Sequence, residues 1–375
     1  MDRISLYWFS RWRRIRPFCI PLIIVMAVRV IGAIWFYRDM VTPGSGFYFA
    51  WLDVNRNLIP ASSRWLFLFN AGDSFLFPLV AMFGYTHSRY VFLPAYPVLI
   101  RFVGSVVGDY WFGAFLVTQV FALASIVMFQ LLAEQYMESR EALYAAILMG
   151  TFPYVSVFTT LGYSEALFLF STIAAWYFHK KESFGVSMIL AGLACLTRIY
   201  GFLILLPIFL DMIRSKRYRR LLYLLIPCVF IGSWLLYCYL STGDPLISWT
   251  EERAVYYVVG TNLGLVQTIW GQLTHGIPGS GLDPAVLISF VLFTFLAVRV
   301  WRVDQYLWTY TVVTFGLLAF AVTSHITLLR YMSFIFPIWL TIKVRNTLVA
   351  AVCVAFFVPV TFLLWLYAIT VFFVG

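Results

Sequence analysis

Long apolar runs alternate with short polar breaks along most of the chain. The first run covers residues 17–36, and later runs cover 110–133, 142–160 and 165–178. A helix that crosses a bilayer needs about 20 predominantly apolar residues, and most of these runs approach that length. None alternates residue by residue between polar and apolar, as the strands of a membrane β-barrel do. The pattern therefore predicts an all-α, polytopic helical membrane protein.

The second half of the chain continues this pattern. Residues 183–214 predict two short spans hinged at residues 197–201, and residues 221–240 predict one span. The remaining predicted spans cover 284–300, 305–322, 329–342 and a final run that ends near residue 375. We expect about eleven transmembrane helices in one domain over residues 1–375.

Composition agrees, because 62% of the residues are hydrophobic and only 11% are charged. Topology explains the net charge of +10 better than nucleic acid does. With the N-terminus in the cytoplasm, most of the 26 lysines and arginines fall in cytoplasmic segments, as the positive-inside rule requires. This orientation leaves a large external loop over residues 37–108 and a second one over residues 241–282. The large loop is rich in aromatic residues, so we expect short juxtamembrane helices there.

The sequence contains no pattern typical of a cofactor or metal site. The five cysteines all lie in apolar stretches without a CxxC pair, which indicates small buried side chains rather than disulfides or metal ligands. The four histidines are scattered, and neither an HExxH motif nor a glycine-rich nucleotide loop occurs. We therefore expect neither a cofactor nor a metal.

Charged residues occur at the ends of apolar segments on the predicted external face. They are Asp73, Glu165, Arg198, Asp244 and Arg330. Ionisable groups at membrane depth are costly and commonly mark a functional site. Simpler interpretations exist for each: Asp73 and Glu165 as helix caps, Asp244 as a turn residue, and the arginines as side chains that reach lipid headgroups. Convergence of all five on one face is more than headgroup contact requires.

The stretch that follows Asp73 carries the most specific motif. Phe77 lies four residues after Asp73, Gly84-Tyr85 lies eleven and twelve residues after it, and FLPAYP follows at residues 92–97. This spacing resembles the PIG-V-like mannosyltransferases, which belong to the GT-C type membrane glycosyltransferases that use polyprenyl-phosphate sugars. Gly72 stands where that family has a tryptophan.

Later motifs resemble those of the same family in the same order. They are YSEALF at residues 163–168, Thr197-Arg198 with Gly201, and Arg330-Tyr331 before Phe336-Pro337. The resemblance implies a GT-C type fold and inverting transfer of a hexose, mannose above all. It implies two partners in the membrane lipid, a dolichyl- or polyprenyl-phosphate sugar donor and a lipid-linked or glycan acceptor. The protein would be integral to the cell membrane or endoplasmic reticulum, with its site on the external or lumenal face.

The residue types fit sugar transfer on chemical grounds as well. The acceptor hydroxyl must lose a proton, and a carboxylate, here Asp73, is the expected general base. Negative charge builds on the leaving phosphate, and the arginine fork matches it in charge and geometry. We expect the donor phosphate to be bound by Arg198, Arg330 and Arg89. The other residues expected to line the pocket are Glu165, Asp244, Tyr85, Tyr96, Tyr163 and Tyr331.

Two other functions remain as alternatives. A transporter or flippase of lipid-linked sugars would carry charged residues through the full membrane depth together with a structural repeat, whereas here the unexplained charges cluster at one surface. A non-catalytic membrane scaffold would have no need of Asp73.

Overall fold

The computed structural model describes residues 18–31, 66, 69, 72–256, 284–321 and 325–372. Every regular element in these ranges is helical, which confirms the predicted all-α fold of a polytopic membrane protein. After a first apolar helix at Phe18–Ile31, the elements are η2 (Gly72–Phe75), α3 (Leu76–Phe83), η3 (His87–Val91), α4 (Ala95–Val107), α5 (Tyr110–Ala133), α6 (Ser139–Thr151), α7 (Pro153–Phe158), α8 (Glu165–Lys180), α9 (Phe184–Cys195), η4 (Ile199–Ile204), α10 (Leu205–Arg214), η5 (Tyr218–Leu224), α11 (Leu225–Thr242), α12 (Ile247–Tyr256), α14 (Pro284–Arg299), η6 (Val300–Arg302), α15 (Gln305–Ala321), α16 (His325–Ser333), η7 (Phe336–Thr341) and α17 (Thr347–Phe372).

Within the described ranges, three helical segments are long and apolar enough to cross a membrane. They are Tyr110–Ala133, Tyr218–Thr242 and Thr347–Trp365. Other predicted spans consist of two shorter elements, with a proline at or near the break. The predicted span 142–160 is divided into α6 and α7 at Phe152, whose ψ of 132° is not helical. A residue before proline is disfavoured in the helical region, and Pro153 follows directly. The predicted span 329–342 is likewise divided between α16 and η7, which begins with Phe336-Pro337.

The two predicted external loops are described only in part. Residues 37–65 of the first loop lie outside the described ranges, and its second part forms η2, α3, η3 and α4. Residues 257–282 of the second loop also lie outside them, and its beginning forms α12. The single-domain organisation over residues 1–375 stays a prediction.

A tight helical hairpin joins α4 to α5. Gly108 ends α4 with a φ of 77°, a conformation that glycine adopts at little cost. Asp109 then caps α5, because its carboxylate accepts hydrogen bonds from the backbone N–H groups of Trp111 at 2.8 Å and Phe112 at 3.1 Å. A Cβ on Gly113 would lie 2.8 Å from the backbone nitrogen of Gly104, so the two helices can approach this closely only through glycine. The hairpin fixes the elements that follow Asp73 against the long helix α5.

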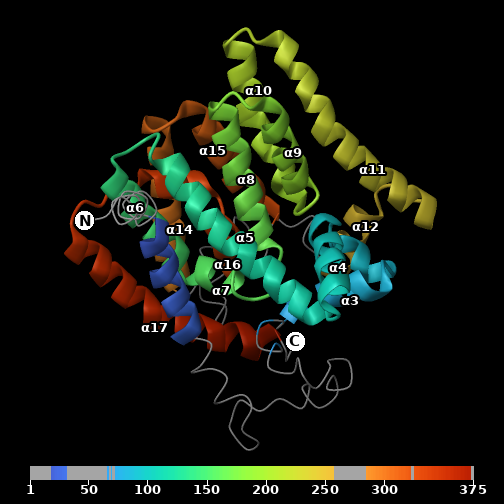
Figure 1. Cartoon of the computed structure of the whole chain (residues 1–375), viewed down its shortest axis with the longest axis horizontal. Coiled ribbons are helices and arrows are strands. Elements are labelled where there is room, and N and C mark those ends of the chain that lie inside the picture. Colours follow the sequence, from blue (N-terminus) through green and yellow to red (C-terminus); the bar gives the residue numbers. More distant parts are fainter. Residues whose placement is uncertain are drawn as a thin grey trace, which may run out of the picture.

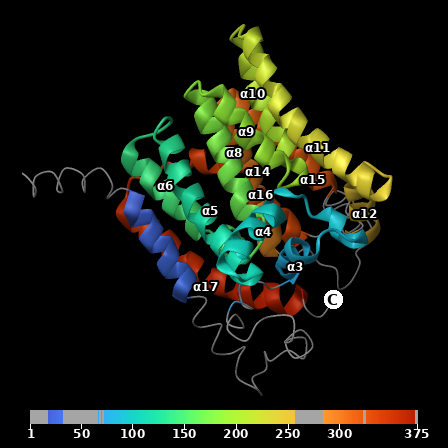
Figure 2. The same cartoon turned by 45° about the vertical axis from the view of Figure 1, so that its right-hand side comes forward.

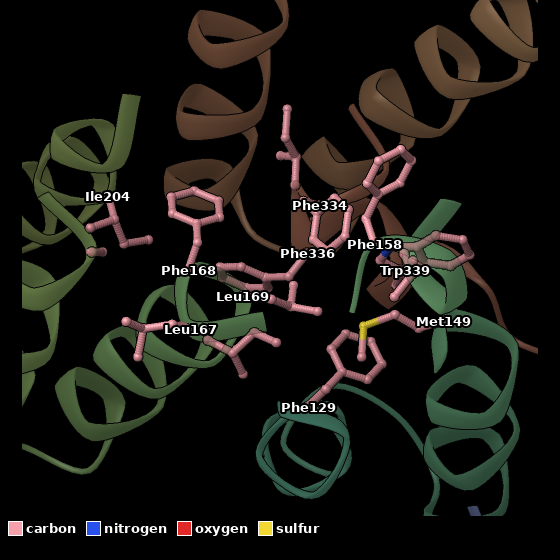
Figure 3. Close-up of a cluster of buried hydrophobic side chains, with 14 of the residues drawn as sticks. Phe129, Met149, Phe158, Leu167, Phe168, Leu169, Ile204, Phe334, Phe336 and Trp339 are labelled. Carbon is pink, nitrogen blue, oxygen red and sulfur yellow. The ribbon is translucent and has the colours of Figure 1, made fainter. Parts of the chain in front are cut away.

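Helix α8 lies at the centre of the bundle, between α5 and α9 (Figures 1 and 2). Helices α17 and α11 lie on opposite flanks of the bundle in both views. Figure 3 shows the core beside α8, where Phe129, Met149, Phe158, Leu167 and Trp339 gather from five different elements. Lipid is as apolar as this core, so close packing and polar pairs hold such helices together more than the hydrophobic effect does. Polar pairs inside the bundle therefore show which helices are held to one another.

Candidate active site

A buried carboxylate pairs with two arginines at the N-terminus of α8. Glu165 is the first residue of α8, and its side chain is 0% exposed. Arg330 of α16 donates from Nε to Glu165 Oε1 at 2.6 Å, and its Nη2 pairs with the same oxygen. Arg198 pairs through Nη1 with Glu165 Oε2 at 2.9 Å and also donates to Ser164 Oγ at 3.2 Å. The sequence-based alternatives for these three residues, helix capping and contact with headgroups, are not what the structure shows.

Arg198 owes its position to a sharp change of direction after α9. The residue is extended, and η4 then folds back so that Gly201 lies directly against the carbonyl of Ala194. A Cβ on Gly201 would collide with that carbonyl oxygen. The backbone N–H of Gly201 donates to the Arg198 carbonyl at 2.8 Å and closes the turn. The glycine of this motif is therefore required for close approach of two backbone segments.

Aromatic rings surround the two guanidinium groups. The Cζ atom of Arg330 lies 4.0 Å from the ring centroid of Phe158 and 4.3 Å from that of Tyr163. The Cζ atom of Arg198 lies 4.6 Å from the ring centroid of Tyr331. Such contacts attract a cation to the ring face and hold its orientation. The guanidinium groups are consequently fixed by rings as well as by Glu165.

Asp73 lies beside this cluster, in η2. Its side chain is half-buried, and the charges that act on it most strongly are those of Arg330, Glu165 and Arg198. Its backbone N–H donates a hydrogen bond to the hydroxyl of Tyr163. Burial raises the pKa of Asp73 above its ordinary value, while Arg330 acts in the opposite direction. The N-cap of α3 is Phe75 and carries no side-chain cap bond, so Asp73 does not cap that helix.

Tyr163 connects Asp73 with Arg330. Burial is the largest cause that raises its pKa well above the ordinary value, so the hydroxyl is protonated at neutral pH and available as a donor. The structure thus brings together six residues from four separate stretches of the sequence: Asp73, Tyr163, Glu165, Arg198, Arg330 and Tyr331.

The other predicted pocket residues have different surroundings. Tyr96 is fully buried, with its hydroxyl 2.5 Å from Thr118 Oγ1. Tyr85 belongs to a separate aromatic group, with its ring 4.9 Å from that of Trp234. Arg89 is half-buried in η3.

Asp244 is a turn residue, as its simpler interpretation proposed. Its carboxylate accepts from the backbone N–H of Leu246 at 2.8 Å and from the Thr250 hydroxyl at 3.2 Å. These hydrogen bonds stay within the connection from α11 to α12 and do not reach Glu165. The expected convergence of five charged residues is therefore found for four of them.

Three contact residues of this site were not predicted from the sequence. Phe158 is one of 37 phenylalanines, and nothing in the pattern separates it from the others. Tyr200, whose ring centroid lies 5.5 Å from Cζ of Arg198, and Ser164 both lie within the motifs and could have been found from their closeness in sequence to Arg198 and Glu165. Within the described ranges, no three His, Cys, Asp or Glu side chains gather as metal ligands do.

A family model described as dolichyl-phosphate-mannose-protein mannosyltransferase matches residues 86–242 of the chain. The matched region contains Glu165 and Arg198, while Asp73 and Arg330 lie outside it. No curated protein and no solved structure matches the chain. Together with the apolar helices, the match indicates an integral membrane glycosyltransferase of the mannosyltransferase type. Membership of the PIG-V-like subgroup stays a prediction.

Proposed function

We propose that this protein transfers a hexose, mannose in the first place, from a dolichyl- or polyprenyl-phosphate sugar to a lipid-linked or glycan acceptor. The site would face the external or lumenal side of the cell membrane or endoplasmic reticulum. The observation that carries the proposal is the buried cluster of Glu165 with Arg198 and Arg330, which lies directly beside the half-buried Asp73.

The charge of this cluster suits a phosphate. One carboxylate faces two guanidinium groups, so Glu165, Arg198 and Arg330 together carry one positive charge in excess. The side chain of Arg198 is 13% exposed, against 5% for Arg330 and 0% for Glu165. Arg198 is therefore the more accessible of the two arginines. A phosphate that met Arg198 first would be held by charge-assisted hydrogen bonds in a region of low dielectric constant.

Asp73 would act as the general base of a single displacement. Its carboxylate takes the proton of the acceptor hydroxyl while the acceptor oxygen forms a bond to the anomeric carbon. The bond from that carbon to the phosphate oxygen breaks at the same time, and its electron pair stays on the phosphate. Arg198 and Arg330 would stabilise the charge that builds there. Attack on the side opposite the leaving phosphate inverts the anomeric carbon.

The direct test is transfer by the purified protein in lipid nanodiscs, with radiolabelled mannose and glucose supplied on polyprenyl phosphate in parallel. We expect label to pass to an acceptor from polyprenyl-phosphate mannose and not from a nucleotide-linked mannose. Reconstituted vesicles, assayed for movement of the donor across the bilayer, provide the control for a flippase. Donor movement without any transfer would contradict the proposal.

A change of arginine to lysine should test the phosphate contact. Arg198→Ala and Arg330→Ala should each cost about 1.5–3 kcal/mol in transition-state stabilisation, because each removes a charge-assisted hydrogen bond. Arg198→Lys and Arg330→Lys should recover only part of this, since a point charge replaces a two-pronged fork. The measurement is kcat/KM for the donor. Arg101→Ala on the exposed face of α4 is the matched control and should leave it unchanged. Full activity in both alanine variants would refute the phosphate role.

A further inference from the structure

A third arginine lies buried near the cluster, on the first apolar helix. Arg29 is only 3% exposed, and its guanidinium contacts the connection between α7 and α8, residues 159–164. We propose that Arg29 is a positioning residue for the active site: it holds this α7–α8 loop and thereby sets the places of Tyr163 and Glu165. The inference rests on the proposed function, because its consequence is the alignment of the donor phosphate site.

Arg29 and Gln119 together hold two consecutive residues at the start of the loop. Its Nη2 donates to Thr159 Oγ1, and its Nη1 donates to Gln119 Oε1 of α5 at 3.5 Å. Gln119 in turn donates from Nε2 to the backbone carbonyl of Thr160 at 3.1 Å. The Thr159 hydroxyl donates its own proton to the carbonyl of Val155 at 2.6 Å. Arg29 and α5 therefore fix the start of the loop from two sides.

The helix that carries Arg29 is itself held closely in place. A Cβ on Gly150 of α6 would lie 2.7 Å from Cγ2 of Val25, so the two helices meet without space between them. A guanidinium buried in an apolar bundle is costly unless its donors find acceptors. Within the part of the chain that the structure describes, the guanidinium of Arg29 donates to the uncharged side chains of Gln119 and Thr159. Because Thr159 belongs to the loop, the free energy of burying this cation depends on the position of the loop.

The same loop contacts every part of the proposed site. The backbone N–H of Gly162 donates to the carbonyl of Phe69, and the Tyr163 hydroxyl accepts from the backbone of Asp73. Ser164 accepts from Arg198, and the ring of Tyr163 lies against Arg330. A displacement of the loop would move the partners of the base and of both phosphate-binding arginines together. Positions of reacting groups tolerate little error, since a shift of about 1 Å can cost a hundredfold in rate.

The test is a pair of nearly isosteric changes at Thr159. Thr159→Val removes the hydroxyl that accepts from Arg29, and Thr159→Ser keeps it. We expect Thr159→Val and Arg29→Gln each to raise the donor KM about tenfold, and Thr159→Ser to stay near the wild-type value. A purely structural role would reduce the amount of folded enzyme, and hence Vmax, without changing the donor KM. Thermal unfolding of each purified variant checks that it is folded.

A double variant tests whether Arg29 acts through Thr159. If it does, Arg29→Gln combined with Thr159→Val should raise the donor KM no further than the stronger single change. Arg140→Gln is the control, because Arg140 donates to Thr347 Oγ1 at 3.0 Å and joins two helices away from the loop. Two results would overturn the inference about Arg29 and leave the proposed function standing. One is an unchanged donor KM in folded Arg29→Gln and Thr159→Val, and the other is full additivity in the double variant. A wild-type protein that neither binds nor uses the donor would overturn the proposed function, and the inference with it.

Discussion

Asp73→Asn is expected to lower turnover by about 10²–10⁴-fold, the usual loss when a general base is removed. Asparagine has nearly the same volume as aspartate, but its amide does not take up the acceptor proton. The donor phosphate would still meet Arg198 and Arg330, so donor affinity should change little. The measurement is turnover beside donor binding for purified wild type and variant.

Asp109→Asn is the matched control for this experiment. Asp109 caps α5 through two backbone N–H groups, and asparagine caps a helix about as well as aspartate. Its turnover should therefore equal that of the wild type. Near wild-type turnover in Asp73→Asn would remove Asp73 from the mechanism. Glu165, and Asp53, which lies outside the described residues, would then be the candidates for the base.

The pH profile gives an independent measurement of the same role. Burial raises the pKa of Asp73 above the ordinary aspartate value of about 3.9, although Arg330 partly offsets the effect. A base acts only when deprotonated, so kcat/KM should fall as the pH drops through this raised pKa. The fall should therefore occur at higher pH than for an ordinary aspartate, and Asp73→Asn should lack it.

The bounds of several elements could be predicted from the sequence. Helix α5 begins and ends at Tyr110 and Ala133 as predicted, because hydropathy changes sharply at both ends. The hinge at residues 197–201 lies between α9 and α10, as its polar and glycine residues indicated. The broken helices were predicted as continuous because hydropathy does not register the backbone angle that precedes a proline.

The contacts between the charged side chains could not be predicted in the same way. Hydropathy assigned Asp73, Glu165, Arg198, Asp244 and Arg330 to one face, but a shared face does not decide which side chains meet. Glu165 and Arg330 are separated by 165 positions in the sequence, and only helix packing brings them into contact. Asp244 shares the predicted face, yet its hydrogen bonds stay within its own turn. The pairing of Glu165 with both arginines therefore depends on the three-dimensional arrangement.

That pairing leads to the second large expected effect, on stability. Glu165→Gln keeps the shape of the side chain but leaves two buried guanidinium groups without their anion. Breaking a buried ion pair by removal of one partner typically costs about 3–5 kcal/mol. The matched control is Glu138→Gln, whose carboxylate lies 2.9 Å from Arg345, the same separation as between Glu165 and Arg198.

The Glu138 side chain is 66% exposed, so water screens its pair with Arg345 and the loss should be about 0–1 kcal/mol. The measurement is the free energy of unfolding of both variants in the same detergent. Equal losses would show that Arg198 and Arg330 do not depend on Glu165 for their charge balance.

If the donor phosphate binds these arginines, addition of polyprenyl phosphate should supply the missing negative charge. It should then stabilise Glu165→Gln more than the wild type, because only the variant lacks an anion between the two guanidinium groups.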